Sequence, residues 1–348
     1  MNGARDDELT AEAVIEVDQR FGEPTVFTLD LPLTVRGGDL PLLTDPRVGP
    51  GGELAVVAAA GGQRICLVWG PVTGQRITLV HGGTGSRLTV HGADASLAMA
   101  REDRAEVWAD GSDSGAVATL AARYGFTADV AATATVRAET GHALVQREPD
   151  LALVRRLARR NGYCAWLTSA EQGTHTLHFR PPPVDQAPAA ELSINTDPPS
   201  VESLEITWDT ERPAAGAAAQ LDPRSKKLLE GRVAQSPLAV LGARPYAEIA
   251  ADAARRTAWL PVTADDAADL HGRLTAEVAA NSFFARATGT TTDRLAGGIL
   301  RAPSVVRLRG AGSRHSGPWL CARVRHRIDE TAHTMQFELV RNGWGQKT

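Results

Sequence analysis

Short runs in which apolar and polar residues alternate dominate the first hundred positions of the chain. The runs with the period of a half-buried β-strand are 14–17, 26–29, 54–57, 65–69, 76–80 and 87–90. Glycine and proline clusters separate them, as at Gly70 and Pro71, and such clusters favour turns. The pattern predicts an antiparallel β-barrel or β-sandwich over residues 1–108.

The pattern changes to helical spacing after Trp108. Asp113 or Ser114 is a candidate N-cap of a helix that ends before Gly125. A second helix is predicted to begin at Pro149 and to end at Gly162. Two alternating runs, 163–168 and 174–180, follow it across a short turn. Residues 109–183 are therefore predicted to form a small α/β module.

Prolines at positions 181–183 and 188 indicate a domain boundary, because proline fixes φ and donates no backbone hydrogen bond. Beyond it, strands are predicted over 192–194, 204–208, 305–309, 318–327 and 334–340, helices over 246–256 and 265–280, and an Ala/Pro/Gly-rich loop over 213–219. Residues 184–348 thus predict a second strand-rich domain with helical segments, which can share strands with the first. The predicted fold class is mainly β with an α/β insertion.

Composition narrows the class of protein. The 348 residues are 43% hydrophobic and 22% charged, as in ordinary folded domains. The net charge of −4 argues against specific nucleic-acid binding, which needs a basic surface. No basic segment precedes an apolar leader and no apolar run reaches about 18 residues, so we expect synthesis in the cytoplasm without a signal peptide, and no stable membrane insertion.

Candidate catalytic chemistry is absent from the sequence. His175 and His178 lie on opposite faces of a predicted strand and cannot share a metal ion. The segment 111–115 resembles a nucleophile elbow but has Asp113 in place of the serine. Asp265, Asp266 and Asp269 fit the first turn of a helix, where carboxylates are favourable. We therefore predict no catalytic residue, no cofactor and no metal, and hence no enzyme.

Four segments, taken in order, carry a family resemblance. They are 87–108, with G-x-D-x-S-x-x-M-x-R-E beginning at Gly92; 113–130, with a helix and then Tyr-Gly-Phe; 148–182, with D-L and then R-L-A before Gly162 and Tyr163; and 310–342, ending in Phe-Glu-Leu-Val-Arg-Asn. In this order they resemble the phage late control protein D family, the baseplate hub proteins of contractile phage tails and phage-tail-like contractile injection systems.

The resemblance implies a structural role in virion assembly. Each subunit of such a homotrimer contributes two tube-type β-barrel domains to a pseudo-sixfold ring, which joins a sixfold tail tube to a threefold spike. The expected partners are the spike, the tail tube and other baseplate proteins, in a particle that can act outside the cell. Only residues 343–348 follow Asn342, so the spike is expected to be a separate protein.

Two groups of arginines are candidate interface residues. Arg155, Arg156, Arg159 and Arg160 share one face of the second predicted helix, which fits either a docking face for an acidic partner or a solvated helix face. Arg323 and Arg325 alternate on a late strand, as do Arg307 and Arg309. Because residues two apart share a strand face, each pair is predicted to face the lumen or a neighbouring subunit.

Two alternatives remain beside the hub. A tail-associated cell-wall hydrolase would need two carboxylates held about 5–10 Å apart in a cleft, and no motif nominates such a pair. A carbohydrate-binding β protein would need clustered exposed aromatic residues, and the chain has only three tyrosines.

Overall fold

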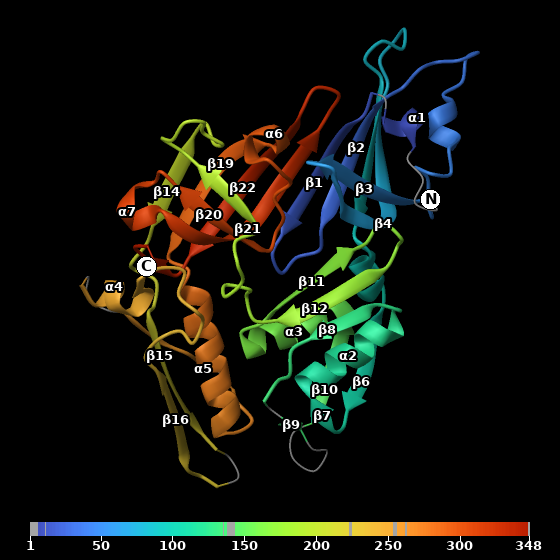
Figure 1. The fold of residues 1–348 in the computed structure, drawn as a ribbon. Coiled ribbons are helices and arrows are strands. Elements are labelled where there is room, and N and C mark those ends of the chain that lie inside the picture. Colours follow the sequence, from blue (N-terminus) through green and yellow to red (C-terminus); the bar gives the residue numbers. More distant parts are fainter. Residues whose placement is uncertain are drawn as a thin grey trace.

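The chain folds mainly into β-sheets, with the longer helices α2, α3 and α5 in the lower half of the view (Figure 1). The computed structural model describes residues 6–10, 12–134, 136–137, 143–222, 225–252, 256–261 and 263–346. The strands are β1 Val14–Arg20, β2 Val26–Pro32, β3 Glu53–Ala60, β4 Gln63–Thr78, β5 Arg87–Ala93, β6 Asp103–Trp108, β7 Gly111–Ser112, β8 Thr127–Val130, β9 Val136–Arg137, β10 Leu144–Pro149, β11 Cys164–Ser169, β12 His175–Arg180, β13 Ala190–Ser193, β14 Leu204–Trp208, β15 Ala215–Leu221, β16 Leu228–Val233, β17 Arg244–Pro245, β18 Thr257–Trp259, β19 Ala285–Thr292, β20 Ser304–Arg309, β21 Gly317–Ile328, β22 His333–Arg341 and β23 Gly343–Trp344. The helices are α1 Asp7–Thr10, α2 Asp113–Arg123, α3 Asp150–Asn161, α4 Tyr246–Asp252, α5 Ala267–Asn281, α6 Asp293–Ala296 and α7 Gly312–His315, with 3₁₀ turns η1 Pro41–Thr44 and η2 Ala95–Ala100.

An eleven-stranded sheet, here called the large sheet, unites the two ends of the chain. Its main path is β14-β19-β22-β21-β1-β2-β5-β4-β3, with β20 beside β21 and β13 beside β20. Strand β1 lies between β21 and β2, so Val17 pairs with both His326 and Phe27. The N-terminal β-region and the C-terminal strands therefore share one hydrogen-bonded sheet.

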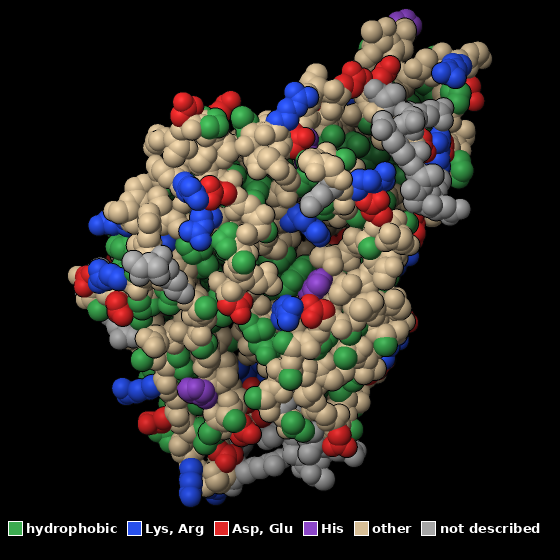
Figure 2. All heavy atoms as spheres, in the orientation of Figure 1, with side chains coloured by type: hydrophobic (Ala, Val, Ile, Leu, Met, Phe, Trp, Pro, Cys, Tyr) green, Lys and Arg blue, Asp and Glu red, His purple; other side chains and the backbone are tan. Residues whose placement is uncertain are grey.

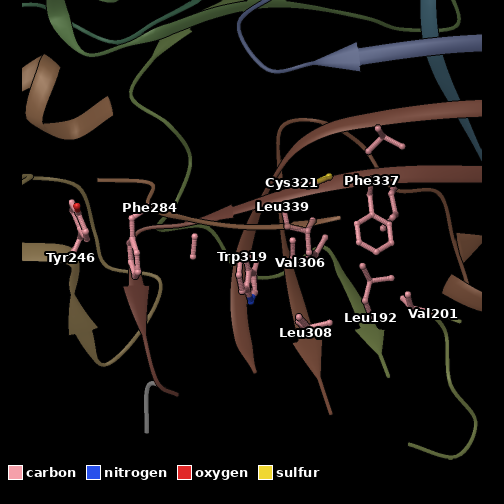
Figure 3. Close-up of a cluster of buried hydrophobic side chains, with 14 of the residues drawn as sticks. Leu192, Val201, Tyr246, Phe284, Val306, Leu308, Trp319, Cys321, Phe337 and Leu339 are labelled. Atoms are coloured by element: carbon pink, nitrogen blue, oxygen red, sulfur yellow. The ribbon is translucent and has the colours of Figure 1, made fainter. Parts of the chain in front are cut away.

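Two apolar cores lie against the large sheet. The C-terminal core contains Trp319, fully buried, together with side chains from β13, β20 and β22 (Figure 3). The N-terminal core is built from alternate residues of β1, β2 and β5, among them Val17, Phe27 and Val90. Alternation places their polar neighbours on the opposite face, which is the general reason why these sequences form strands with one buried face.

The α/β module has its own core, and it includes β6, which was predicted to belong to residues 1–108, because β6 pairs only with β10 among the described strands and Trp108 packs against this core. Leu153, Val154 and Leu157 of α3 are fully buried against α2 and strands β10, β11 and β12. Helix α3 follows Pro149 and stops at Gly162, which adopts the left-handed conformation with φ of 68° that glycine accommodates best. The predicted bounds of this helix match the structure.

A projecting unit, here called the arm, consists of β15, β16, β18 and α5. Helix α5 packs on one face of the three-stranded sheet, with Leu274 above Gly216 and Gly231. A Cβ on Gly231 would lie 2.7 Å from Leu274, so the glycine allows the helix to approach the sheet closely. Strand β15 covers most of the segment predicted as a loop. That prediction was wrong because contact with α5 stabilises a strand made of alanine and glycine, whose own β propensity is low.

Two further local predictions differ from the structure, and a third lies partly outside the described residues. Strand β4 continues through Gly70 and Pro71, where a turn was predicted. Glycine at position 70 allows β4 to pass Ala93, whose carbonyl oxygen would lie 2.0 Å from an added Cβ. Ser112, rather than Asp113 or Ser114, caps α2, because its Oγ accepts a hydrogen bond of 3.0 Å from the Gly115 N–H. Helix α4 ends at Asp252, and residues 253–255 of the predicted helix lie outside the described residues.

Candidate assembly surfaces

The arginines of α3 make contacts that hold the module against the rest of the chain. Arg155 forms an ion pair with Glu23, in the turn between β1 and β2. Arg160 reaches Asp265 at 2.7 Å and Asp269 at 2.6 Å, at the start of α5. Burial alone would lower the pKa of Arg160, but these carboxylates raise it above its ordinary value. Arg160 is therefore a link between the module and the arm.

The other two predicted α3 arginines differ from each other. Arg156 Nε lies 2.6 Å from a Glu148 oxygen, and its Nη2 donates to the Val145 carbonyl. Arg159 is exposed and makes no ion pair with any residue that the structure describes. Arg159 is therefore the one arginine of these four that has no carboxylate partner among the described residues.

The predicted strand arginines lie on the polar face of the large sheet. Arg323 and Arg325 form ion pairs with Asp18 and Glu16 on the adjacent strand β1, the latter at 2.6 Å. The hydrogen bond with Asp18 raises the pKa of Arg323. On β20, Arg309 pairs with Glu191 at 2.8 Å, and Arg307 is exposed. Arg323 and Arg325 also line a groove of about 560 Å³ that continues over β22, β19 and β14.

A wider cleft of about 930 Å³ opens where the module, the arm and the large sheet meet. Its arginines are Arg156, Arg159, Arg160, Arg212, Arg273 and Arg286, and its aromatic residues are Phe21, Tyr163, Trp208, Phe283 and Phe284. Four of these arginines are ion-paired within the chain, including Arg286 with Glu338 and Arg273 with Asp269. The positive charges are thus mostly balanced, and Figure 2 shows basic and acidic side chains interspersed across this view of the molecule.

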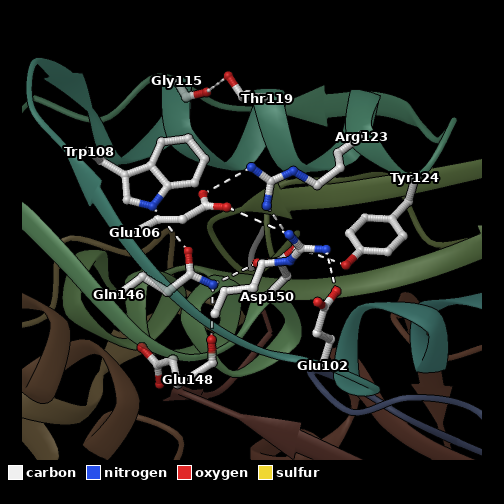
Figure 4. A network of polar contacts seen from close by, with 11 residues as sticks. Glu102, Glu106, Trp108, Gly115, Thr119, Arg123, Tyr124, Gln146, Glu148 and Asp150 are labelled. Atoms are coloured by element: carbon white, nitrogen blue, oxygen red, sulfur yellow. Dashed lines mark hydrogen bonds and ion pairs between the residues drawn. The ribbon is translucent and has the colours of Figure 1, made fainter.

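A polar network inside the module is where a catalytic carboxylate pair could be sought (Figure 4). Asp150 is fully buried and accepts hydrogen bonds from Tyr124 at 2.8 Å and Gln146 at 2.6 Å. Arg123 bridges Asp150 and Glu106, at 3.2 and 2.9 Å. Because these two carboxylates are joined through a guanidinium, the cluster ties β6, β10, α2 and α3 together.

The two histidines of β12 have separate surroundings. His178 stacks on Trp166 and shares a hydrogen bond of 2.6 Å with Asp129. His175 hydrogen-bonds Ser169 and packs at right angles to Trp69.

Among the described residues, no group of three or more His, Cys, Asp or Glu is placed to hold a metal ion. No helix in the described ranges is long and apolar enough to cross a membrane.

A buried histidine pair lies in the large sheet, and no sequence pattern singled it out. His326 Nδ1 of β21 and His333 Nε2 of β22 are 2.9 Å apart, and His326 is fully buried. The other ring nitrogen of His326 has no hydrogen-bond partner among the described residues. Burial, together with His333 and the positive charge of Arg301, lowers the pKa of His326 to about 3.

Comparison with known proteins gives one family match. A family model described as the Alg8 N-terminal domain matches residues 34–330, which is most of the chain. A search of curated proteins with this sequence finds no match.

Solved structures with a similar fold are phage tail proteins and a secretion-system component. The 43 kDa tail protein of prophage MuSo2 from Shewanella oneidensis superposes with a TM-score of 0.65 at 14% identity, over 95% of this chain and 94% of that one. The tail protein from Neisseria meningitidis MC58 gives 0.63 at 16% identity, over 95% and 92%. The E. coli c3393 protein, a component of the type VI secretion system with structural similarity to the T4 tail proteins gp27 and gp5, gives 0.56 at 11% identity, over 96% and 75%. The chain therefore has a phage-tail-protein fold.

Proposed function

This chain belongs to the Alg8 N-terminal domain family, and from its fold we propose that it is a structural subunit of the baseplate hub of a contractile phage tail or phage-tail-like injection system. The observation that carries the proposal is the likeness to tail proteins over nearly the whole length of both chains. A structural similarity limited to one domain would support only the presence of that domain in both proteins. Here it extends from the N-terminal β-region to the C-terminal strands.

The large sheet supports a ring of subunits. Its main path ends at two strands, β14 and β3, that have one neighbour each. An open edge with unpaired backbone groups can extend a sheet into another chain. Three copies joined head to tail would form a closed ring, which requires two different surfaces on each copy. In this proposal residues 1–108 and 184–348 are the two tube-type units, and residues 109–183 lie outside the ring.

The polar face of the large sheet is suited to line the channel of this ring. Arg323 and Arg325 are ion-paired with Asp18 and Glu16 on that face, so their charges are compensated before any partner binds. A lumen lined by such pairs is wettable and lacks a strong field of either sign. In the proposed assembly the ring joins the sixfold tail tube to a separate threefold spike.

The solution mass tests the proposal. We would measure light scattering after size exclusion over a concentration series, with and without a candidate spike protein. A mass near three times 36.9 kDa, alone or with the spike, is expected. The proposed hub would be contradicted if the protein were a monomer at every concentration and bound neither the spike protein nor the tube proteins. Electron microscopy of the trimer fraction should show a ring with a central channel.

A further inference from the structure

Two exposed sheet faces lie at opposite ends of a stack of layers. The stack runs from the arm sheet through α5 and α3 to the two-stranded sheet of β6 and β10, and each layer contacts the next. Figure 1 shows the arm at the lower left and the β6–β10 sheet at the lower right. The outer faces of these two sheets, here called the arm face and the module face, therefore lie on different sides of the molecule.

The arm face presents three rows of paired residues. Helix α5 covers the face that contains Gly216 and Gly231, so the alternate residues of β15 and β16 point away from the helix. The rows from base to tip are Ala217 with Arg232, Ala219 with Glu230, and Leu221 with Leu228. Leu221 and Leu228 are 63% and 59% exposed, and Trp259, paired with Ala217 from the other side, is 64% exposed.

The module face also presents three rows. Leu144 and Gln146 of β10 point into the module and are buried, so their neighbours point outward. The rows are Asp103 with Pro149, Ala105 with Arg147, and Val107 with Val145. Val107 is 66% exposed and Val145 is 46% exposed.

The rows of the two faces are complementary in the same order. Arg232 in the first arm row matches Asp103, and Glu230 in the second matches Arg147. The third rows are both aliphatic pairs. Each row advances two residues along its strands, so the two ladders have a common spacing.

The four charged side chains are available for such pairing. All four are exposed, and none makes an ion pair within the part of the chain that the structure describes. This distinguishes them from the α3 arginines, most of which already face carboxylates of the same chain.

We infer that the arm face of one copy docks on the module face of the next copy. The occupant is a second copy of this chain because both complementary surfaces are present on every copy, on different sides of it. A contact of this kind is heterologous, and it closes into a ring when the rotation between copies allows. The inference rests on the proposed hub and names a contact between its subunits outside the sheet.

Charge reversal tests the contact. Arg232→Glu and Asp103→Arg each place like charges opposite one another, and we expect each to weaken self-association about tenfold or more. The double variant restores an opposite pair at every contact, so its association is expected to return to within about threefold of the original protein. Arg294→Glu, an exposed arginine on α6 away from both faces, is the matched control and should leave the mass unchanged. Unaltered circular dichroism would show that each variant folds.

Cross-linking tests the third row directly. Leu228→Cys and Val145→Cys in one chain are expected to give disulfide-linked oligomers under oxidation, and neither single variant should do so. If the protein is trimeric but the reversals leave its mass unchanged and no cross-link forms, the docking is wrong and the proposed hub stands. If the reversals weaken the trimer and the double variant does not recover, the pairing of Arg232 with Asp103 is refuted. A monomeric original protein, with or without the spike, would overturn the hub and the docking together.

Discussion

The buried His326 is expected to make the fold sensitive to acid, and its contribution follows from the structure. In the folded protein its pKa is about 3, against an ordinary value of 6.5, because it is buried beside His333 and near Arg301. Between these two values the unfolded chain binds a proton that the folded chain does not. Stability is therefore fully present above about pH 6.5 and falls as the pH is lowered through this window.

The size of the effect follows from the width of the window. About 1.4 kcal/mol is lost per pH unit, so the full separation between 6.5 and about 3 corresponds to about 5 kcal/mol. Roughly 3 kcal/mol of this is already lost at pH 4.5. His326→Leu removes the titrating group and also the ring nitrogen that has no hydrogen-bond partner. It also leaves Nε2 of the largely buried His333 without its partner, so at pH 7.5 the variant is expected to be about 1–3 kcal/mol less stable than the original protein.

The assay is urea unfolding followed by tryptophan fluorescence at pH 7.5 and pH 4.5. Other groups titrate in both proteins, so the quantity of interest is the difference between their losses in unfolding free energy. We expect His326→Leu to lose about 3 kcal/mol less than the original protein between the two pH values. His81→Gln, in the exposed turn between β4 and β5, controls for the loss of a histidine as such. Equal losses in the original protein and His326→Leu would refute the reasoning.

Three further predictions concern packing, a buried charge and thiol chemistry. Gly70→Ala is expected to cost about 2–3 kcal/mol of unfolding free energy, because the added Cβ would meet the Ala93 carbonyl oxygen. The control Gly74→Ala should cost far less, since an added Cβ there has no atom within 4 Å, and equal losses of melting temperature in the two variants would contradict the prediction. Asp150→Asn is expected to lose roughly 2–4 kcal/mol of unfolding free energy, since Arg123 would keep its charge and lose a buried carboxylate partner. Asp185→Asn, on the surface, is the control in calorimetry, and equal melting temperatures for the two variants would contradict the role of the polar network in stability. Burial raises the pKa of Cys66 to about 11 and that of Cys321 to about 12, so at pH 8 a thiol reagent should modify neither of these two buried thiols until urea is added. Cys164, whose pKa burial also raises to about 12, is half-buried and lines the wide cleft, so any slow labelling of the folded protein is expected there, and rapid labelling of Cys66 or Cys321 would show that their burial is wrong.

The predictions made from the sequence were correct where the residues that determine an element lie within or beside that element. Pro149 and Gly162 delimit α3 because both residues act on the backbone at their own positions. The alternation in β1 and β2 predicted strands because it reports directly which residues are buried. The predictions for β4 and β15 failed because the deciding contacts, from Ala93 to Gly70 and from Leu274 to Gly216, come from other parts of the chain.

The candidate interface residues show the same limit. The grouping of arginines on one face of α3 is visible in the sequence, but the carboxylates that pair with Arg160 lie more than a hundred positions away. The complementary rows of β15–β16 and β6–β10 likewise need the strand registers, which no motif encodes. Their role in assembly stays a prediction until the mass measurements are made.

The position of β1 has a consequence for how the chain is made. One of its two neighbours, β21, is synthesised much later, since Arg323 and its partner Asp18 are 305 positions apart. Until then β1 can pair only with β2, and one of its edges stays open. Completion of the sheet must therefore wait until β21 has been synthesised, and contacts of such long sequence separation form slowly. A chain that ended before β21 would keep that edge of β1 exposed.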